Sequence, residues 1–228
     1  MFFDMNYLFW VVLPGIVLSG IAQFYVRSAY SRWSQVRNGA NLGGGQVAET
    51  IFNRTNLAPT PMAQVPGQMT DHYDPGQNIV RLSQGTVQSP SIAAMAIAAH
   101  ELGHVQQFQQ QSPLIQARQF LVPAVKIGPN VGYIMIIAGL MLNVLGLAWL
   151  GVILFALSAL FMLVTLPVEL DASNRAMRLL DESGLLVTAE DRQGARAVLN
   201  AAAFTYLAAL VTSLLQLLYY ISLVQRRR

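Results

Sequence analysis

Residues 127–168, IGPNVGYIMIIAGLMLNVLGLAWLGVILFALSALFMLVTLPV, form a run of 42 residues that contains no charged side chain. One helix needs about 20 apolar residues to cross the hydrocarbon core of a bilayer, so this run is long enough for two. We expect two spanning helices joined by a tight turn within 143–149, where Asn143 and Gly146 interrupt the apolar pattern. The run therefore predicts a transmembrane hairpin.

Two further uncharged segments lie at the ends of the chain, residues 5–26 and 198–224. Each is long enough to cross a bilayer, and the first lacks the small-residue cleavage site of a signal peptide. Tyr219 and Tyr220 are placed as an aromatic belt near the end of the last segment. With 54% hydrophobic and 11% charged residues, the sequence predicts a mainly α, polytopic membrane protein with about four transmembrane helices.

The sequence His100-Glu101-Leu102-Gly103-His104 follows an apolar helical stretch. On a helix, residues four apart lie on one face with Cβ atoms about 6 Å apart, so both imidazoles can reach one Zn²⁺ with Glu101 beside it. The alternative is a surface helix with two solvated histidines. The apolar residues 93–99 argue against it, because burying an unpaired histidine or glutamate costs several kcal/mol. The motif predicts a zinc site.

The helix that carries the motif is expected to begin with Ser89 as its cap and to stop at Ser112-Pro113. Gly103 costs such a helix about 1 kcal/mol relative to alanine. This indicates either a close approach of another segment or a glycine that is merely tolerated. The glutamine-rich residues 106–111 are expected to form a solvated helix end.

The polar segment before the motif helix is expected to contain a helix over 45–53 and a short β-hairpin with strands 68–73 and 78–83. The second strand is a candidate to take up substrate backbone as an added strand, although it could equally be a plain hairpin capping the domain. His72 and Tyr73 are candidate hydrogen-bond donors to an oxyanion, with an ordinary polar loop role as the alternative.

A catalytic zinc site usually has three protein ligands and one water, so a third ligand is needed. The chain has no cysteine, and His72 is the remaining histidine. Glu169 and Asp171 directly follow the hairpin, where an ionisable group is costly unless it has a partner or a function. We expect Glu169 to be the ligand and Asp171, which can pair with Arg175 one turn later, to support it. Asp171 or His72 as ligand, and a solvated helix start, remain open.

Three stretches carry a resemblance to a known family: His72-Tyr73-Asp74-Pro75, the run from Ser91 through the motif, and residues 166–173, LPVELDAS. Together they resemble the YugP-like family of bacterial membrane zinc metallopeptidases. More distantly the layout is similar to the HtpX and CAAX-prenyl-protease gluzincins, in which a glutamate after a transmembrane hairpin completes the zinc site. That wider group commonly has an aspartate four residues after the ligand glutamate. Here the position is Ser173, so the surroundings of His100 should differ, and Asp171 is the candidate replacement.

The resemblance implies a zinc metallopeptidase that hydrolyses membrane proteins or peptides at the membrane surface. In that function His100, His104 and Glu169 bind zinc, and Glu101 is the general base. The first alternative is a membrane scaffold that binds partners through a zinc-stabilised domain and has no catalytic activity. Glu101 argues against it, because a structural zinc site needs no general base. The second is an ion channel or transporter, which the few polar residues along the spans disfavour.

Basic residues suggest the orientation in the cell membrane. Eleven of the 14 lysines and arginines fall in 27–126 and 167–199, which would lie in the cytoplasm with the active site. A fourth full span would place Arg226 to Arg228 outside the cell, contrary to the charge rule. A re-entrant or tilted last helix would remove this conflict. The +3 net charge is explained by membrane anchoring, so no nucleic-acid partner is expected.

The expected division of the chain follows from these segments: an anchor over 1–27, a zincin-like domain over 28–126, the hairpin over 127–168, a ligand-bearing helical segment over 169–197, and a last helix with a basic tail over 198–228. Gly132, Gly139 and residues 201–203 are small enough for close helix packing. That packing could occur within one chain, in a homo-oligomer or with a membrane partner subunit.

Overall fold

The computed structural model describes residues 5–226 and is mainly α-helical. Four helical segments are long and apolar enough to cross a membrane, which confirms the predicted fold class. The first comprises α1 (Met5–Tyr7), a π-helical turn (Leu8–Val12) and α2 (Leu13–Trp33). The others are α6 (Pro113–Met141), α7 (Leu145–Glu182) and α8 (Ala189–Gln225).

The described residues form two compact units. An apolar unit contains the described residues up to Gln23, Gln116–Val168 and the described residues from Phe204 on, and a polar unit contains Phe24–Ile115 and Glu169–Ala203. Helix α6 enters the apolar unit at Gln116, eleven residues before the uncharged run begins at Ile127. The polar unit is therefore discontinuous in sequence. Its second part, Glu169–Ala203, directly follows the predicted hairpin.

Helices α6 and α7 form the predicted hairpin, with Asn143 in a left-handed conformation between them. The turn is shorter than expected, because Gly146 and Trp149 already belong to α7. Glycines allow the two helices to pack closely: a Cβ at Gly132 would overlap the backbone of Gly151, and one at Gly139 would overlap Ala148. Both predicted small-residue contacts therefore occur within the chain.

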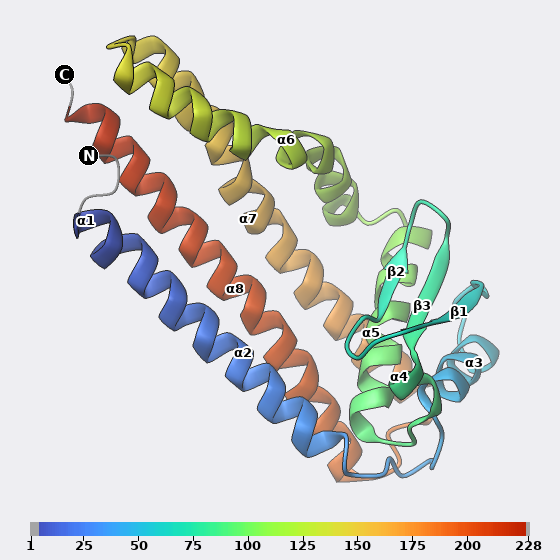
Figure 1. Cartoon of the computed structure of the whole chain (residues 1–228). Helices are drawn as coiled ribbons and strands as arrows, with labels where there is room; N and C mark the ends of the chain where they lie inside the picture. Colours follow the sequence, from blue (N-terminus) through green and yellow to red (C-terminus); the bar gives the residue numbers. More distant parts are fainter. Residues whose placement is uncertain (1–4, 227–228) are drawn as a thin grey trace. The chain divides into compact units, whose positions relative to one another are not determined.

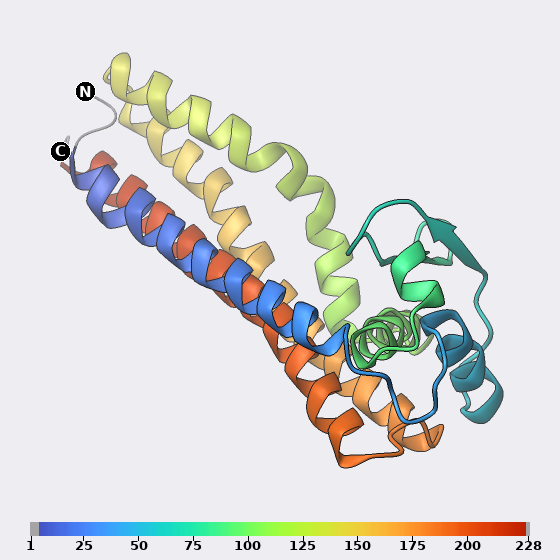
Figure 2. The same ribbon diagram turned by 60° about the horizontal axis from the view of Figure 1, so that its bottom comes forward.

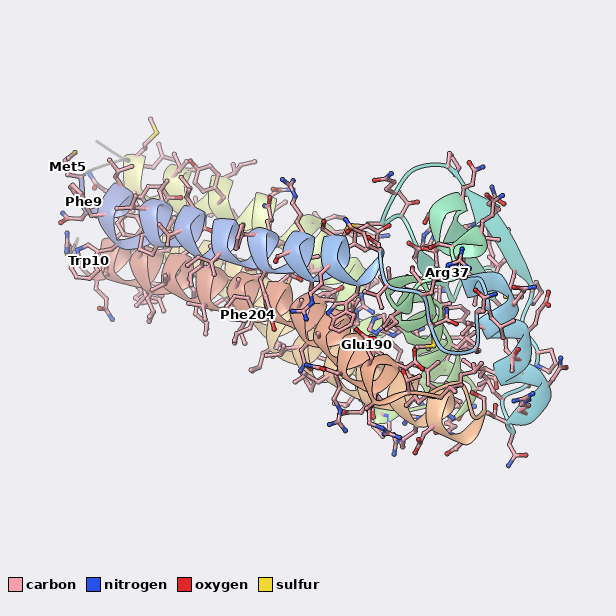
Figure 3. All side chains as sticks on the ribbon, turned by 90° about the horizontal axis from the view of Figure 1, so that it is seen from below. Met5, Phe9, Trp10, Arg37, Glu190 and Phe204 are labelled. Carbon is pink, nitrogen blue, oxygen red and sulfur yellow. The ribbon has the colours of Figure 1, made fainter. Side chains whose placement is uncertain are left out.

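Helix α8 runs unbroken from Ala189 to Gln225, so the suggested re-entrant last segment is wrong. The start of α1 and the end of α8 lie at one end of the apolar unit (Figures 1 and 2). The expected aromatic belt is also wrong, because Tyr219 and Tyr220 are buried against Tyr7 and Phe155. Large exposed apolar side chains lie instead on the first helical segment, where Figure 3 labels Met5, Phe9 and Trp10.

The polar unit is built around α5 (Ile92–Gln109), whose alanine-rich first half is buried. Helix α3 (Gly44–Arg54), predicted over 45–53, buries Val47 and Ile51 in the same core. The cap of α5 is Ser91, whose hydroxyl accepts a hydrogen bond from the amide of Ala94. The prediction of Ser89 was wrong because an additional short helix, α4 (Gln84–Gln88), ends there.

A three-stranded sheet completes the polar unit, with strand order β1-β3-β2 (Figure 1). The predicted hairpin is present as β2 (His72–Asp74) and β3 (Ile79–Ser83), although its first strand is shorter than expected. The sequence did not predict β1 (Met62–Val65), which pairs with β3 in parallel. Because β3 is central, the expectation that it takes up substrate backbone is wrong, and the free edges belong to β1 and β2.

Candidate metal centre

Two helices of the polar unit bring three potential ligands together. Helix α5 places His100 and His104 on one face with ring centroids 4.8 Å apart, and α7 supplies Glu169. The Oε2 atom of Glu169 lies 3.3 Å from the Nε2 atom of each histidine. All three side chains are at most 16% exposed. Among the described residues these three form a group that could hold a metal ion.

The spacing of these atoms fits ligands of one ion better than a direct ion pair. A charged N–H···O hydrogen bond is usually about 2.7–2.9 Å long. Two ligands of a tetrahedral zinc, each bonded at about 2.0–2.1 Å, lie about 3.4 Å apart. The observed separation of 3.3 Å between Nε2 and Oε2 in both pairs agrees with the second geometry.

The other nitrogen of each histidine already has a partner, which leaves Nε2 to face the metal. Gln107 Nε2 donates to Asp171 over 2.8 Å, so the Oε1 of Gln107, 3.0 Å from His104 Nδ1, accepts a hydrogen bond from that nitrogen. His100 Nδ1 lies 3.4 Å from the hydroxyl of Ser173. Such partners fix the tautomer and the ring orientation that metal binding needs.

A chain of hydrogen bonds extends from His104 through Gln107 to Asp171 and Arg175. Gln107 is fully buried, and Arg175 Nε donates to Asp171 over 2.6 Å, as its i, i+4 spacing predicted. Asp171 thus supports His104 through an amide, whereas the position next to His100 is taken by Ser173. The expectation that Asp171 replaces the missing aspartate at His100 was therefore wrong.

The glutamine-rich end of α5 is exposed from Gln109 on, as expected, but several of its side chains also make tertiary hydrogen bonds. Gln106 and Gln110 accept hydrogen bonds from Arg175, and Gln109 bonds to the backbone of Ala58. Gln107 could have been found from its position three residues after His104, since residues at that spacing share a helix face.

Close packing at Gly103 brings the two ligand-bearing helices together. A Cβ at this position would overlap the carbonyl oxygen of Ala172 in α7, so the predicted close approach is confirmed and the tolerated-glycine alternative is wrong. We expect Gly103→Ala to push α7 away from α5 and to weaken zinc binding at least tenfold. Zinc titration of the purified protein measures this. Gly85→Ala, where added bulk meets nothing within 4 Å, is the control and should bind zinc normally.

Glu101 is buried beside the three ligands and is held by the sheet. Its Oε2 atom accepts a hydrogen bond of 2.8 Å from the backbone amide of Tyr73 in β2, and its side chain is 7% exposed. Tyr73 itself bonds to Asn78 through its hydroxyl and packs its ring against Phe108. The edge strand β2 therefore fixes the position of this carboxylate.

The candidate His72 and the other acidic residues of the polar unit lie outside the three-residue group or have other partners. His72 is exposed, and its Nδ1 lies 2.8 Å from the carbonyl oxygen of Thr70. Asp71 and Asp74 accept hydrogen bonds within the sheet and its turn, and Asp191 accepts them from Gly39 and Thr188. These contacts leave Glu169 as the carboxylate that accompanies the two histidines.

The electrostatics of the site favour a cation between the ligands. Burial by itself lowers the pKa of His104, but hydrogen bonding to Glu169 and the charges of Glu169 and Glu101 outweigh it and raise that pKa. The carboxylates therefore stabilise positive charge at this point. A divalent metal would supply that charge and leave the imidazoles neutral.

Comparison with known proteins assigns the chain to a family. The profile of the family described as "Putative neutral zinc metallopeptidase" matches residues 8–225. The chain belongs to this family of zinc metallopeptidases. It is also 36% identical over 211 residues to the "Putative membrane protease YugP" of Bacillus subtilis (strain 168), covering 92% of this chain and 93% of that protein. No solved structure matches the chain.

Membership of the zinc metallopeptidase family implies zinc, and the donor set fits that metal. Two imidazole nitrogens and one carboxylate oxygen are the protein ligands of many catalytic zinc sites. In this chain His100, His104 and Glu169 would hold the ion.

We expect Gln107→Ala to lower zinc affinity about tenfold to a hundredfold, because His104 loses the partner that orients its ring. Competition titration with a zinc-binding dye measures the affinity. Gln109→Ala, which removes a glutamine of the same helix that bonds to the backbone of Ala58 instead, is the matched control. Equal affinities for the two variants would contradict a positioning role for Gln107.

Proposed function

We propose that this protein is a zinc-dependent endopeptidase that cleaves membrane proteins or peptides at the membrane surface. The observation that carries the proposal is the placement of Glu101 beside His100, His104 and Glu169, with the amide of Tyr73 fixing its carboxylate. A structural zinc site usually has four protein ligands and needs no adjacent base. Three ligands with a buried glutamate are typical of hydrolysis.

Zinc, when bound, acts as a Lewis acid that polarises the scissile carbonyl group and promotes ionisation of water. Glu101 takes the proton from the attacking water and returns it to the leaving amine. The hydrogen bond from Tyr73 limits the rotamers of Glu101, so less orientational freedom has to be lost in the transition state. Gln107 holds His104 in the tautomer that leaves Nε2 for the metal, and the hydroxyl of Ser173 lies beside Nδ1 of His100.

The edge strand β2 is the candidate to bind substrate backbone, in place of the central strand β3. Its Tyr73 amide donates to Glu101, so this N–H is not available to substrate, but an extended peptide along this edge would still lie beside the proposed base. His72 lies on the same strand and keeps its proposed role as a hydrogen-bond donor to the reacting carbonyl oxygen.

We expect His72→Phe to lower kcat about tenfold to a thousandfold without changing the zinc content. The loss follows if the imidazole stabilises the charge that develops on the carbonyl oxygen. Steady-state peptide cleavage together with metal analysis measures both quantities. Unchanged kcat would remove His72 from the catalytic residues.

The four apolar helices and the membrane protease relative support a multi-pass membrane protein. We propose that the polar unit lies on the cytoplasmic side, because it contains most of the basic residues that flank the spans. In this proposed topology with four complete spans, Arg226 would lie on the opposite side, which the charge rule alone would not have predicted.

Peptide hydrolysis by the full-length protein in lipid nanodiscs tests the proposed function. The zinc-loaded protein should cleave an unfolded fluorogenic protein substrate, lose that activity when zinc is chelated, and regain it on addition of zinc. A scaffold or a channel that binds zinc would show no cleavage in any of these states. Absence of cleavage by fully zinc-loaded protein across a diverse peptide library would contradict the proposal.

A further inference from the structure

An open polar cavity of about 460 Å³ lies within the polar unit, between α7 and α8. Three guanidinium groups line it, from Arg178 on α7 and from Arg192 and Arg196 on α8, and Asn174 adds an amide. We call it the arginine cavity. Arg192 and Arg196 are one turn apart on α8, and of these two Arg192 is paired with a carboxylate, that of Asp181.

Two carboxylates also line the cavity, and both are neutralised by arginine. Asp171 accepts a hydrogen bond from Arg175, and Asp181 pairs with Arg192. Within residues 5–226, neither Arg178 nor Arg196 forms an ion pair. The charge of Arg178 acts on Asp171 at longer range, but the two arginines without an ion pair leave the cavity with a net positive charge and exposed hydrogen-bond donors.

The hydrogen-bond donors of the arginine cavity indicate which class of ligand it can bind. A guanidinium group presents a planar fork of N–H donors that matches two oxygens of a phosphate, and the Asn174 amide can add another hydrogen bond. The cavity is polar and lined by long side chains, so it suits a charged group better than an apolar one. A phosphate-bearing anion is the ligand that this arrangement fits.

The position along the helices indicates where that phosphate comes from. Arg196 precedes the uncharged run 198–224 by two residues, about 3 Å along α8, and Arg178 follows the run 127–168 by ten residues, about 15 Å along α7, with Asn174 between them at about 9 Å. The headgroup layer of a bilayer is about 5–8 Å thick on each side, and arginine side chains extend toward it. We propose that the arginine cavity binds the phosphate of an anionic phospholipid headgroup.

Native mass spectrometry of the full-length protein tests this proposal. The detergent-purified protein is incubated with an equimolar mixture of phosphatidylglycerol and phosphatidylcholine, and the retained lipids are counted. Wild type should retain phosphatidylglycerol preferentially. The double variant Arg178→Gln with Arg196→Gln should retain it about tenfold less, since each arginine near an anionic headgroup contributes substantially to binding. Equal retention by both proteins would overturn the proposal.

Two further variants separate a built site from general surface charge. Arg27→Gln removes an exposed arginine that also follows an apolar span but lies outside the cavity, and it should retain phosphatidylglycerol like wild type. Replacing Arg178 and Arg196 with lysine keeps the charge but removes the planar fork, so retention should be intermediate. An equal loss with Arg27→Gln would contradict a specific cavity.

Thermal unfolding in the presence of inorganic phosphate identifies the source of the anion. Phosphatidylglycerol should raise the Tm of wild type but not of the glutamine double variant, and inorganic phosphate alone should leave both unchanged. Stabilisation of wild type by inorganic phosphate with no added effect of the lipid would overturn the assignment to a headgroup. These readouts measure binding, so their failure leaves the proposed peptidase activity untouched.

Discussion

Replacing Glu101 with glutamine is expected to lower peptide hydrolysis about a thousandfold while one zinc ion per chain remains bound. The amide keeps the size of the side chain and an oxygen that can accept the hydrogen bond from Tyr73. It cannot take a proton from water at neutral pH. Glu101 is not one of the three grouped donor residues, so the metal ligands are preserved.

The measurement pairs cleavage rates with metal analysis on the same preparation. Glu49→Gln is the matched control, because it makes the same chemical change on an exposed face of α3. It should be fully active. Substantial activity of Glu101→Gln would mean that another group is the base, and loss of zinc from this variant would mean that Glu101 is a ligand.

Replacing Glu169 with alanine is expected to remove both zinc and activity. The two histidines alone provide two ligands from one helix, and the carboxylate closes the site from α7. Loss of a protein ligand from a three-ligand site should weaken zinc binding by more than the tenfold to hundredfold effect of a supporting residue. Zinc titration by calorimetry measures the affinity.

Glu182→Ala provides the control for this change, because it removes an exposed carboxylate at the end of the same helix. Zinc affinity should then equal that of wild type. Asp171→Asn serves as a second comparison, because it alters the support of His104 and leaves Glu169 in place. If Glu169→Ala retains zinc and Asp171→Asn loses it, the assignment of the third ligand changes to Asp171.

Much of the fold was predictable because membrane spans and the zinc motif are local patterns. Residues 127–168 predicted the hairpin from their length, and the spacing of His100 and His104 predicted a shared helix face. Glu169 could be chosen because a carboxylate immediately after an apolar run is costly without a partner. These inferences need only the sequence near each residue.

The contacts that organise the site around its ligands were not predictable from the sequence in the same way. Gln107 looks like any glutamine of a polar helix end until α7 brings Asp171 against it. The parallel pairing of β1 with β3 joins segments that no local sequence pattern links, and it covers the outer edge of β3, so that the free edges belong to β1 and β2. Such features depend on tertiary packing, which a local pattern does not encode.

The position of the tyrosines near the end of α8 illustrates the same limit. An aromatic pair near a span end is typical of an interfacial belt, but Tyr219 and Tyr220 pack against Tyr7 and Phe155 inside the apolar unit. The choice between lipid and a neighbouring helix depends on which helix face is covered. Single-sequence composition does not determine that face.

X-ray absorption spectroscopy at the zinc edge, on the purified protein with one equivalent of zinc, tests the central claim most directly. The chain contains three histidines and no cysteine, so the number of imidazole ligands identifies the residues involved. Coordination by His100, His104 and Glu169 predicts two imidazole nitrogens at about 2.0–2.1 Å, with oxygen atoms completing the coordination shell. Three imidazoles would place His72 on the metal, and a zinc ion bound only by oxygen would contradict the site altogether.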